Sequence, residues 1–305
     1  MITHEDKKKT VLELNQVSKV YGSVPALQQI DLKVGPGQIV ALLGCNGAGK
    51  TSLVNLAAGL IEPSAGVVQI FGQHPNSSYA KFHRRILPQE LSFPKQLRVR
   101  EVLKVVSAHY PPSDYESVAE EIGLSPLFDR PSSALSGGER RKLALLCSLA
   151  GHPELVLMDE PTANVDLVGQ EAIRRVIRRY FKNRQSSMVF SSHHMAEVED
   201  LADRVVVMSQ GRIVFDGNVD QIRSFFGEKK VLFRPSAVRS NWTLPGVTKV
   251  IQEEHLVELH GASSDDLLKG VLQVDPAASH FRIELPTLEE AILKIWQSHS
   301  KRESQ

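Results

Sequence analysis

A glycine-rich segment near the beginning of the chain has the residue types and spacing that bind phosphate. Its sequence is Gly44-Cys45-Asn46-Gly47-Ala48-Gly49-Lys50-Thr51, which fits the pattern G-x-x-x-x-G-K-S/T and follows an apolar run over Ile39 to Leu43. In such a loop the backbone N–H groups turn inward and bind phosphate oxygens. Lys50 would bring its charge to the β- and γ-phosphates, and Thr51 would offer its hydroxyl to Mg²⁺. The segment therefore predicts a nucleoside triphosphate site.

Two carboxylates follow a second apolar run, Leu155 to Met158. A strand buried on both faces is usually apolar throughout, so Asp159 and Glu160 mark the sheet edge where open α/β proteins bind ligands. We expect Asp159 to hold Mg²⁺ through its water shell and Glu160 to orient or deprotonate the attacking water. The alternative is that both carboxylates only cap the turn at residues 161–162, but the phosphate loop favours the catalytic interpretation.

A third segment, Ser136-Gly137-Gly138-Glu139, predicts the start of a helix. Ser136 and Glu139 have the spacing of a capping box, in which each side chain binds the other residue's backbone N–H. Two adjacent glycines in a first helical turn cost about 1 kcal/mol each relative to alanine. Their presence favours a position that a ligand approaches closely, and a phosphate at the helix N-terminus is the expected ligand.

The elements that position these segments form an alternating pattern over the first two hundred or so residues. Strand-type apolar runs alternate with helical patterns, which is typical of a mostly parallel α/β sheet. The expected strands are 11–14, 30–34, 39–43, 67–71, 155–158, 188–191, 205–208 and 213–216. Between Phe71 and Leu155 the strand pattern fades, and helices are expected over 99–109, 115–122 and 137–150. A further amphipathic helix is expected over 169–181.

The pattern changes after Gly227 to short alternating runs, which predict a small appended α+β domain. Its expected strands are 231–233, 247–251, 256–259 and 281–285, and its expected helices are 265–273 and 288–296. We therefore expect an α/β domain over residues 10–227, with a helical insertion at about 79–150. The accessory domain is expected over 228–305.

The composition excludes several classes of protein. The 305 residues are 42% hydrophobic and carry a net charge of +1, which is typical of a globular chain and disfavours a broad nucleic-acid surface. The apolar runs are shorter than the ~18 residues needed to cross a bilayer, and the polar residues 1–10 lack a secretory signal. The cytoplasm is the expected location. Cys45 and Cys147 are too few for a disulfide framework or a zinc site.

Taken together, residues 10–227 resemble the ATP-binding subunits of ABC transporters. The segment Leu135-Ser136-Gly137-Gly138-Glu139-Arg140-Arg141-Lys142 is similar to that family's signature, which other phosphate-loop ATPases lack. The resemblance implies an ABC-type phosphate-loop ATPase core with a helical subdomain, and it implies ATP and Mg²⁺ as ligands. Ser52, next to the phosphate loop, joins the implied ATP-binding residues.

The resemblance also implies further site residues. Tyr21 stands where the family's adenine-stacking aromatic lies, and Gln89 corresponds to the glutamine that touches Mg²⁺ or the attacking water. Asp166 is the aspartate of the D-loop, although the preceding residues, Ala163-Asn164-Val165, differ from the family's usual Ser-Gly-Leu. The spacing to Glu197 identifies His193, rather than His194, as the histidine that faces the γ-phosphate.

Family resemblance further implies a head-to-tail homodimer and a membrane partner. The residues that enclose each ATP would be Lys50, Thr51, Asp159, Glu160 and His193 of one subunit and Ser136–Gly138 of the other. Separate permease subunits would dock near residues 89–110 and hold the chain at the inner face of the cell membrane. Leu285–Leu293 is similar to a short motif that ends ABC-2-type exporter ATPases, which favours export.

Two alternatives stay open. One is a soluble ABC ATPase that acts on ribosomes or DNA, and the other is a regulatory subunit that binds ATP without hydrolysing it. A single phosphate loop, a single signature and the absence of a heptad run between them disfavour the first alternative. The presence of Glu160, Gln89 and His193 disfavours the second.

Overall fold

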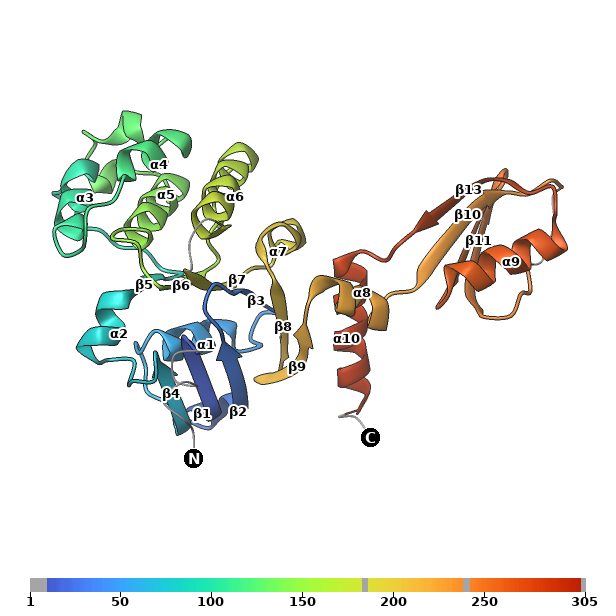
Figure 1. Cartoon of the computed structure of the whole chain (residues 1–305), viewed down its shortest axis with the longest axis horizontal. Helices are drawn as coiled ribbons and strands as arrows, with labels where there is room; N and C mark the ends of the chain where they lie inside the picture. The colour runs from blue at the N-terminus through green and yellow to red at the C-terminus, as the bar shows by residue number, and fades with distance from the viewer. Residues whose placement is uncertain (1–9, 183–185, 238–241, 303–305) are drawn as a thin grey trace. The chain divides into compact units, whose positions relative to one another are not determined.

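The computed structural model describes residues 10–182, 186–237 and 242–302, and the chain divides into two compact units, Met1–Asp216 and Gly217–Gln305 (Figure 1). Residues 1–9, where no secretory signal is expected, lie outside the described residues. Residues 217–227, which the sequence analysis places with the first domain, belong to the second unit. In the part of the chain that the structure describes, no helix combines the length and apolarity needed to span a bilayer.

A six-stranded sheet forms the centre of the first unit. In spatial order its strands are β5 (Arg84–Leu87), β6 (Leu155–Asp159), β7 (Ser187–Ser191), β3 (Ile39–Gly44), β8 (Arg204–Ser209) and β9 (Arg212–Gly217). The first five run parallel. Every residue of β6 and β7 is buried, as expected for parallel strands covered on both faces. The predicted parallel α/β sheet is therefore confirmed.

The unit also contains a three-stranded antiparallel sheet, ordered β2-β1-β4, that the sequence analysis did not separate from the parallel one. Its strands are β1 (Leu12–Tyr21), β2 (Val24–Val34) and β4 (Ala65–Ile70). β1 and β2 are longer than expected because their pairing shifts register, and Gln16 and Gln29 adopt positive φ within them. Such bulges interrupt the alternation of apolar residues from which strands are predicted.

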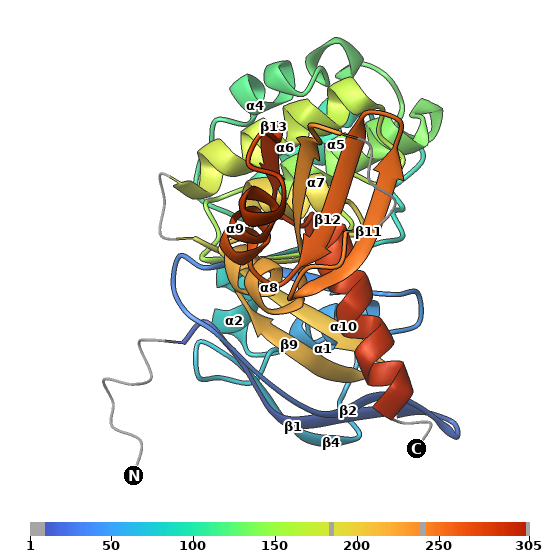
Figure 2. The same cartoon turned by 90° about the vertical axis from the view of Figure 1, so that its right-hand side faces the viewer.

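Helices cover both faces of the parallel sheet. Helix α1 (Lys50–Ala57) lies between the two sheets, and its residues Leu53 and Leu56 join one buried core with both of them. The helices α5 (Gly137–Ser148) and α6 (Leu167–Lys182) lie on the opposite face of the parallel sheet (Figures 1 and 2). The helices beyond α1 are α2 (Ser78–His83), α3 (Val99–Ser107), α4 (Tyr115–Glu121), α5 (Gly137–Ser148), α6 (Leu167–Lys182) and α7 (Met195–Leu201), with 3₁₀ turns at Ser125–Leu127 and Ser132–Ala134.

The region between Phe71 and Leu155 contains a strand and a helix that the sequence analysis missed. β5 begins with Arg84 and Arg85, which are both buried, so its sequence does not read as an apolar run. The guanidinium of Arg85 donates to the carbonyls of Phe82 and Arg84, at 2.8 and 2.7 Å, and it stacks on the ring of Tyr110. Carbonyl acceptors and an aromatic face thus allow charged side chains inside the fold.

The second unit is a small α+β fold, as predicted. Its antiparallel sheet is ordered β11 (Val247–Glu253), β12 (Leu256–Gly261), β10 (Lys229–Arg234) and β13 (Ser279–Glu284). Helix α9 (Ser264–Val274) packs on β10 and β12, and Phe233, Trp242 and Leu267 belong to the shared core. The remaining helices, α8 (Val219–Phe226) and α10 (Leu288–Arg302), pack against each other.

Candidate nucleotide-binding site

The phosphate loop joins the end of β3 to the start of α1, as the motif predicts. Gly47 and Gly49 adopt φ values of 81° and 102°, a region that favours glycine. A Cβ atom on Gly49 would lie 2.6 Å from the carbonyl oxygen of Ala26, and one on Gly44 would lie 2.8 Å from that of Met208. Close packing therefore requires glycine at both invariant glycine positions of the motif, Gly44 and Gly49, and the turn requires it at Gly49 as well. Between them, Cys45 and Asn46 are exposed, and Ala48 is buried.

Lys50 reaches back over this loop. Its ammonium donates to the carbonyl oxygens of Gly44 and Cys45, at 2.7 and 3.2 Å, and the residue is only 9% exposed. Burial lowers the pKa of Lys50, while the charges of Glu160 and Asp159 act in the opposite direction. The structure therefore brings the loop lysine and the two predicted carboxylates into one electrostatic environment. Thr51 and Ser52 lie in the first turn of α1, beside the loop.

Asp159 and Glu160 lie at the end of β6 and are held by Ser191, at the end of the neighbouring strand β7. The Ser191 hydroxyl donates to Oδ1 of Asp159 and accepts from the N–H of Glu160, at 3.0 Å in the second case. Glu160 has a φ of 54°, an uncommon value that often marks functional sites. The sequence analysis missed Ser191. The sequence feature that could have identified it is a hydroxyl residue at the end of a buried strand, because parallel strands bring such ends to the same sheet edge as the carboxylates.

The donor atoms present fit Mg²⁺. Asp159 is only 2% exposed, yet its Oδ2 atom has no hydrogen-bond partner among the described residues. A buried carboxylate oxygen without a partner is costly, so a cation or its bound water is a fitting ligand. The described residues contain no group of three or more His, Cys, Asp or Glu side chains able to hold a metal. Mg²⁺ usually binds one or two carboxylates together with substrate phosphates and water, and Asp159 offers one such carboxylate.

His193 lies beside Glu160. Its Nδ1 atom is 3.2 Å from Oε1 of Glu160, and its ring centroid is 4.0 Å from that of His194. His194 is the first residue before α7, and its pKa is lowered by burial and by His193. Of the two histidines, His193, which the sequence analysis selected, is the one that pairs with Glu160. Glu197 lies behind this loop and accepts a hydrogen bond from the hydroxyl of Ser192, at 2.5 Å.

A cavity of about 190 Å³ brings three predicted segments together in one subunit. Its lining residues are Gln89, Leu91, Gly137, Arg140, Arg141, Glu160, Ala163 and Asn164. The loop that contains Gln89, the first turn of α5 and the end of β6 therefore surround one space. This arrangement places Gln89 and Glu160 around the same cavity.

The predicted capping box at the start of α5 is present, and the two glycines differ in what surrounds them. The N–H of Ser136 donates to Oε2 of Glu139 at 2.7 Å, and the N–H of Glu139 donates to Oγ of Ser136 at 3.2 Å. A Cβ atom on Gly138 would lie 2.8 Å from the carbonyl oxygen of Asn164, whereas one on Gly137 would meet only ordinary contact. Packing within the subunit thus explains Gly138, and Gly137 leaves room for a ligand.

The last two predicted residues lie on separate elements. Tyr21 ends β1, is 46% exposed, and has the ammonium of Lys19 5.2 Å from its ring centroid. Oδ1 of Asp166 accepts from the N–H of Gly169 at 2.6 Å, so this carboxylate caps α6. The two residues that follow it, Leu167 and Val168, are each 82% exposed.

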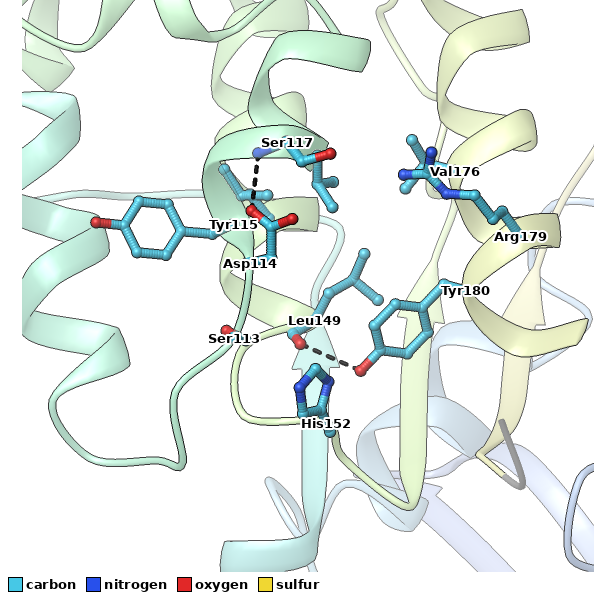
Figure 3. Close-up of a pocket in the computed structure, with 11 residues that line it drawn as sticks. Ser113, Asp114, Tyr115, Ser117, Leu149, His152, Val176, Arg179 and Tyr180 are labelled. Carbon is cyan, nitrogen blue, oxygen red and sulfur yellow. Dashed lines mark hydrogen bonds between the residues drawn. The ribbon is translucent and has the colours of Figure 1, made fainter. Parts of the chain in front are cut away.

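A larger cavity, of about 300 Å³, lies away from all of these residues (Figure 3). It is bounded by α4, the end of α5 and α6, and Tyr180 donates a hydrogen bond to the carbonyl of Leu149 at its edge, at 3.2 Å. Arg179, which also lines it, forms an ion pair with Glu121 at 2.6 Å. None of the predicted site residues lines this cavity, so size alone does not identify the nucleotide site.

Comparison with known proteins agrees with the geometry of the site. Residues 27–163 match the profile of the ABC transporter family. The chain is 30% identical over 220 residues to the bacitracin transport ATP-binding protein BcrA of Bacillus licheniformis, which covers 70% of this chain and 72% of the relative. It is also 30% identical over 298 residues to the sulfate/thiosulfate import ATP-binding protein CysA of a Synechocystis species, covering 86% and 81%.

Solved structures show the same relationship. An ATP-binding subunit of an ABC transporter superimposes with a TM-score of 0.66 at 26% identity, covering 72% of this chain and 94% of that one. A second cassette, described as a dimer in a post-hydrolysis state with ADP and Pi, has a TM-score of 0.61 at 21% identity and shares the fold. It covers 68% of this chain and 98% of that one. The chain therefore belongs to the ATP-binding proteins of ABC transporters, a family of ATPases.

Proposed function

We propose that this chain is the ATP-hydrolysing subunit of an ABC exporter and drives a separate membrane permease by closing, with ATP, into a head-to-tail homodimer. The observation that carries the proposal is the placement of Glu160 beside His193, at the same sheet edge as Asp159. The charges of both carboxylates act on the pKa of Lys50. A loop that only binds nucleotide needs no such carboxylate–histidine pair.

The proposed roles of the residues combine their positions with the resemblance to ABC transporter subunits. The N–H groups of the phosphate loop and the charge of Lys50 bind the β- and γ-phosphates, and Tyr21 stacks on the adenine. Asp159, Thr51 and Gln89 would hold Mg²⁺, which when bound supplies positive charge to the phosphate oxygens. Glu160 accepts a proton from the attacking water or orients it, and His193 holds Glu160 in place and faces the γ-phosphate.

The proposed homodimer is supported by the resemblance to ABC transporter subunits and by the exposed residues near the signature turn. Within one subunit, α1 and α5 lie on opposite faces of the parallel sheet (Figures 1 and 2), and Gly137 of the signature turn lines a cavity with Gln89 and Glu160. A phosphate loop contacts one side of a triphosphate, and a second helix N-terminus from another subunit closes the other side. The exposed Leu167 and Val168, next to Asp166, supply apolar area for such a contact.

The proposed direction of transport depends on one sequence motif. The relatives include a bacitracin transport protein and a sulfate/thiosulfate import protein, so export rests on the similarity of Leu285–Leu293 to the exporter motif. In the structure this segment contains a capping box, because the N–H groups of Thr287 and Glu290 each donate to the other residue's side chain. The motif therefore has a local structural role at the start of α10.

A fractionation experiment tests the transport function. We expect the chain to bind membranes from cells that express its permease, through residues 89–110, and to remain in the soluble fraction without that permease. Sedimentation with ribosomes or DNA, independent of any permease, would support the alternative of a soluble ABC ATPase. The relatives described above are transport proteins, which favours the first outcome.

A further inference from the structure

Arg141, in the second turn of α5, is a buried arginine that binds two loops at once. The residue is 2% exposed. Its Nη1 atom donates to the carbonyl oxygens of Pro88 at 2.6 Å and Gln89 at 3.4 Å. Its Nη2 atom donates to the carbonyl oxygens of Asp159 and Glu160, the latter at 2.5 Å. A single guanidinium thus joins α5 to the loop of Gln89 and to the end of β6.

Three of the four residues whose carbonyls accept from Arg141 have their own proposed roles. Gln89, Asp159 and Glu160 each present a side chain to the site while their carbonyls bind the guanidinium. The planar fork of arginine suits this geometry, since its donors point in fixed directions toward two separate acceptor groups. A change in the position of α5 must therefore either move both loops or break these hydrogen bonds.

Stability alone does not account for a charge at this position. Burial lowers the pKa of Arg141 to about 10, against the opposing charges of Asp159, Glu160 and Glu197, so desolvation of the guanidinium is costly. Well-packed apolar side chains often replace buried charged groups without loss of stability. A buried arginine whose acceptors are confined to two site loops is better explained by what it positions.

We propose that Arg141 is a positioning residue for ATP hydrolysis, which fixes Glu160 and Gln89 through their main-chain carbonyls and couples both to the signature turn Ser136–Gly138. This inference rests on the proposed function of the site. The signature turn of one subunit would contact ATP bound by the other subunit, whereas Glu160 acts on the ATP bound by its own subunit. Arg141 therefore links the closure of one ATP site to the position of the catalytic carboxylate in the second ATP site.

The test compares two substitutions of Arg141 in the full-length chain. Arg141→Met removes all donors and keeps the length, and Arg141→Lys keeps the charge but replaces the fork by one ammonium. For both variants we expect kcat to fall on the order of 10- to 100-fold, because small displacements of catalytic groups have large effects on rate. The Kd for ATP should change by less than about twofold, since Arg141 does not contact the phosphate loop.

Hydrogen exchange supplies a readout that does not depend on turnover. We expect faster amide exchange in both variants over residues 86–91 and 159–163 together. The matched control is Arg84→Met, which removes another buried arginine whose acceptor, the carbonyl of Pro75, belongs to neither of these segments. This control should lose stability but keep the kcat of the folded protein and normal exchange in both segments.

Three results would overturn the inference. They are a kcat for folded Arg141→Met near that of the unsubstituted chain, full activity in Arg141→Lys, or faster exchange confined to α5. If Arg141→Met does not fold, Arg141→Lys still decides the question. An unsubstituted chain that binds but does not hydrolyse ATP would contradict the proposed function instead, and the exchange experiment would still test the coupling.

Discussion

Nδ1 of His193 lies 3.2 Å from Oε1 of Glu160, which joins the loop after β7 to the end of β6. The histidine is half-exposed and the carboxylate is partly buried, so a ligand can reach both from the same side. An imidazole N–H that donates to a carboxylate fixes the orientation of that carboxylate. The pair therefore has the geometry of a carboxylate base held in place by a neighbouring histidine.

Replacing Glu160 separates binding from hydrolysis. Glu160→Gln keeps the size of the side chain and can still hydrogen-bond His193, but it cannot accept a proton from water. We expect unchanged or tighter ATP binding and a loss of hydrolysis of at least ~100-fold, the contribution typical of a general base. A phosphate-release assay and an ATP titration measure the two effects. Full turnover in this variant would show that the base lies elsewhere.

The adjacent histidines provide a matched pair. His193→Ala should lower kcat on the order of 10-fold or more, because Glu160 loses the group that orients it. His194→Ala removes the same side chain one position later and leaves the ion pair between His193 and Glu160 in place, so it should leave kcat within about twofold of the unsubstituted chain. Equal losses in both variants would mean that the loop tolerates no change, rather than that His193 has a specific role.

The hydroxyl of Ser191 should affect Mg²⁺ binding by Asp159, the carboxylate proposed to hold that ion. Ser191→Ala leaves Oδ1 of Asp159 without its donor in a buried position, which costs about 1–3 kcal/mol in the free energy of unfolding. We also expect a higher Mg²⁺ concentration for half-maximal hydrolysis. Ser187→Ala, at the other end of β7, is the control, since its hydroxyl binds Gly35 and Gly37 instead. An unchanged Mg²⁺ dependence in Ser191→Ala would remove this role.

The two cysteines should react very differently with a thiol reagent. Cys45 is exposed within the phosphate loop, whereas burial raises the pKa of Cys147 to about 12, so its thiolate is scarce near pH 8. We expect modification of Cys45 alone, loss of nucleotide binding after modification, and protection by bound ATP. Peptide mass mapping identifies the labelled residue. Labelling of Cys45 at the same rate with and without saturating ATP would contradict its placement beside the phosphates.

Sequence predicted the phosphate loop, the carboxylates and the parallel strands because each has a local pattern. Gly44, Gly49 and Lys50 have fixed spacing, and β6 is apolar up to Asp159. These features depend on neighbours in the chain, so they can be read without knowledge of the fold.

Other features depended on tertiary contacts and could not be predicted. β5 was missed because Arg84 and Arg85 are buried against backbone carbonyls, and the contact of Gly138 with Asn164 joins segments far apart in sequence. Arg141 stands in a run of three basic residues, which is typical of a solvated helix face. Only the structure shows that its guanidinium faces inward.

Mixing two inactive variants tests most directly whether two subunits share each ATP. Lys50→Ala disables the phosphate loop, and Gly137→Asp places a carboxylate in the signature turn, where space for a side chain exists within the subunit. In a head-to-tail dimer that combines both variants, one site receives both defects and the other receives none. We predict that each variant alone is inactive and that their mixture hydrolyses ATP, at roughly a quarter of the unsubstituted rate if pairing is random and the sites act independently. A mixture as inactive as its components, under conditions where mixed dimers form, would contradict the composite site.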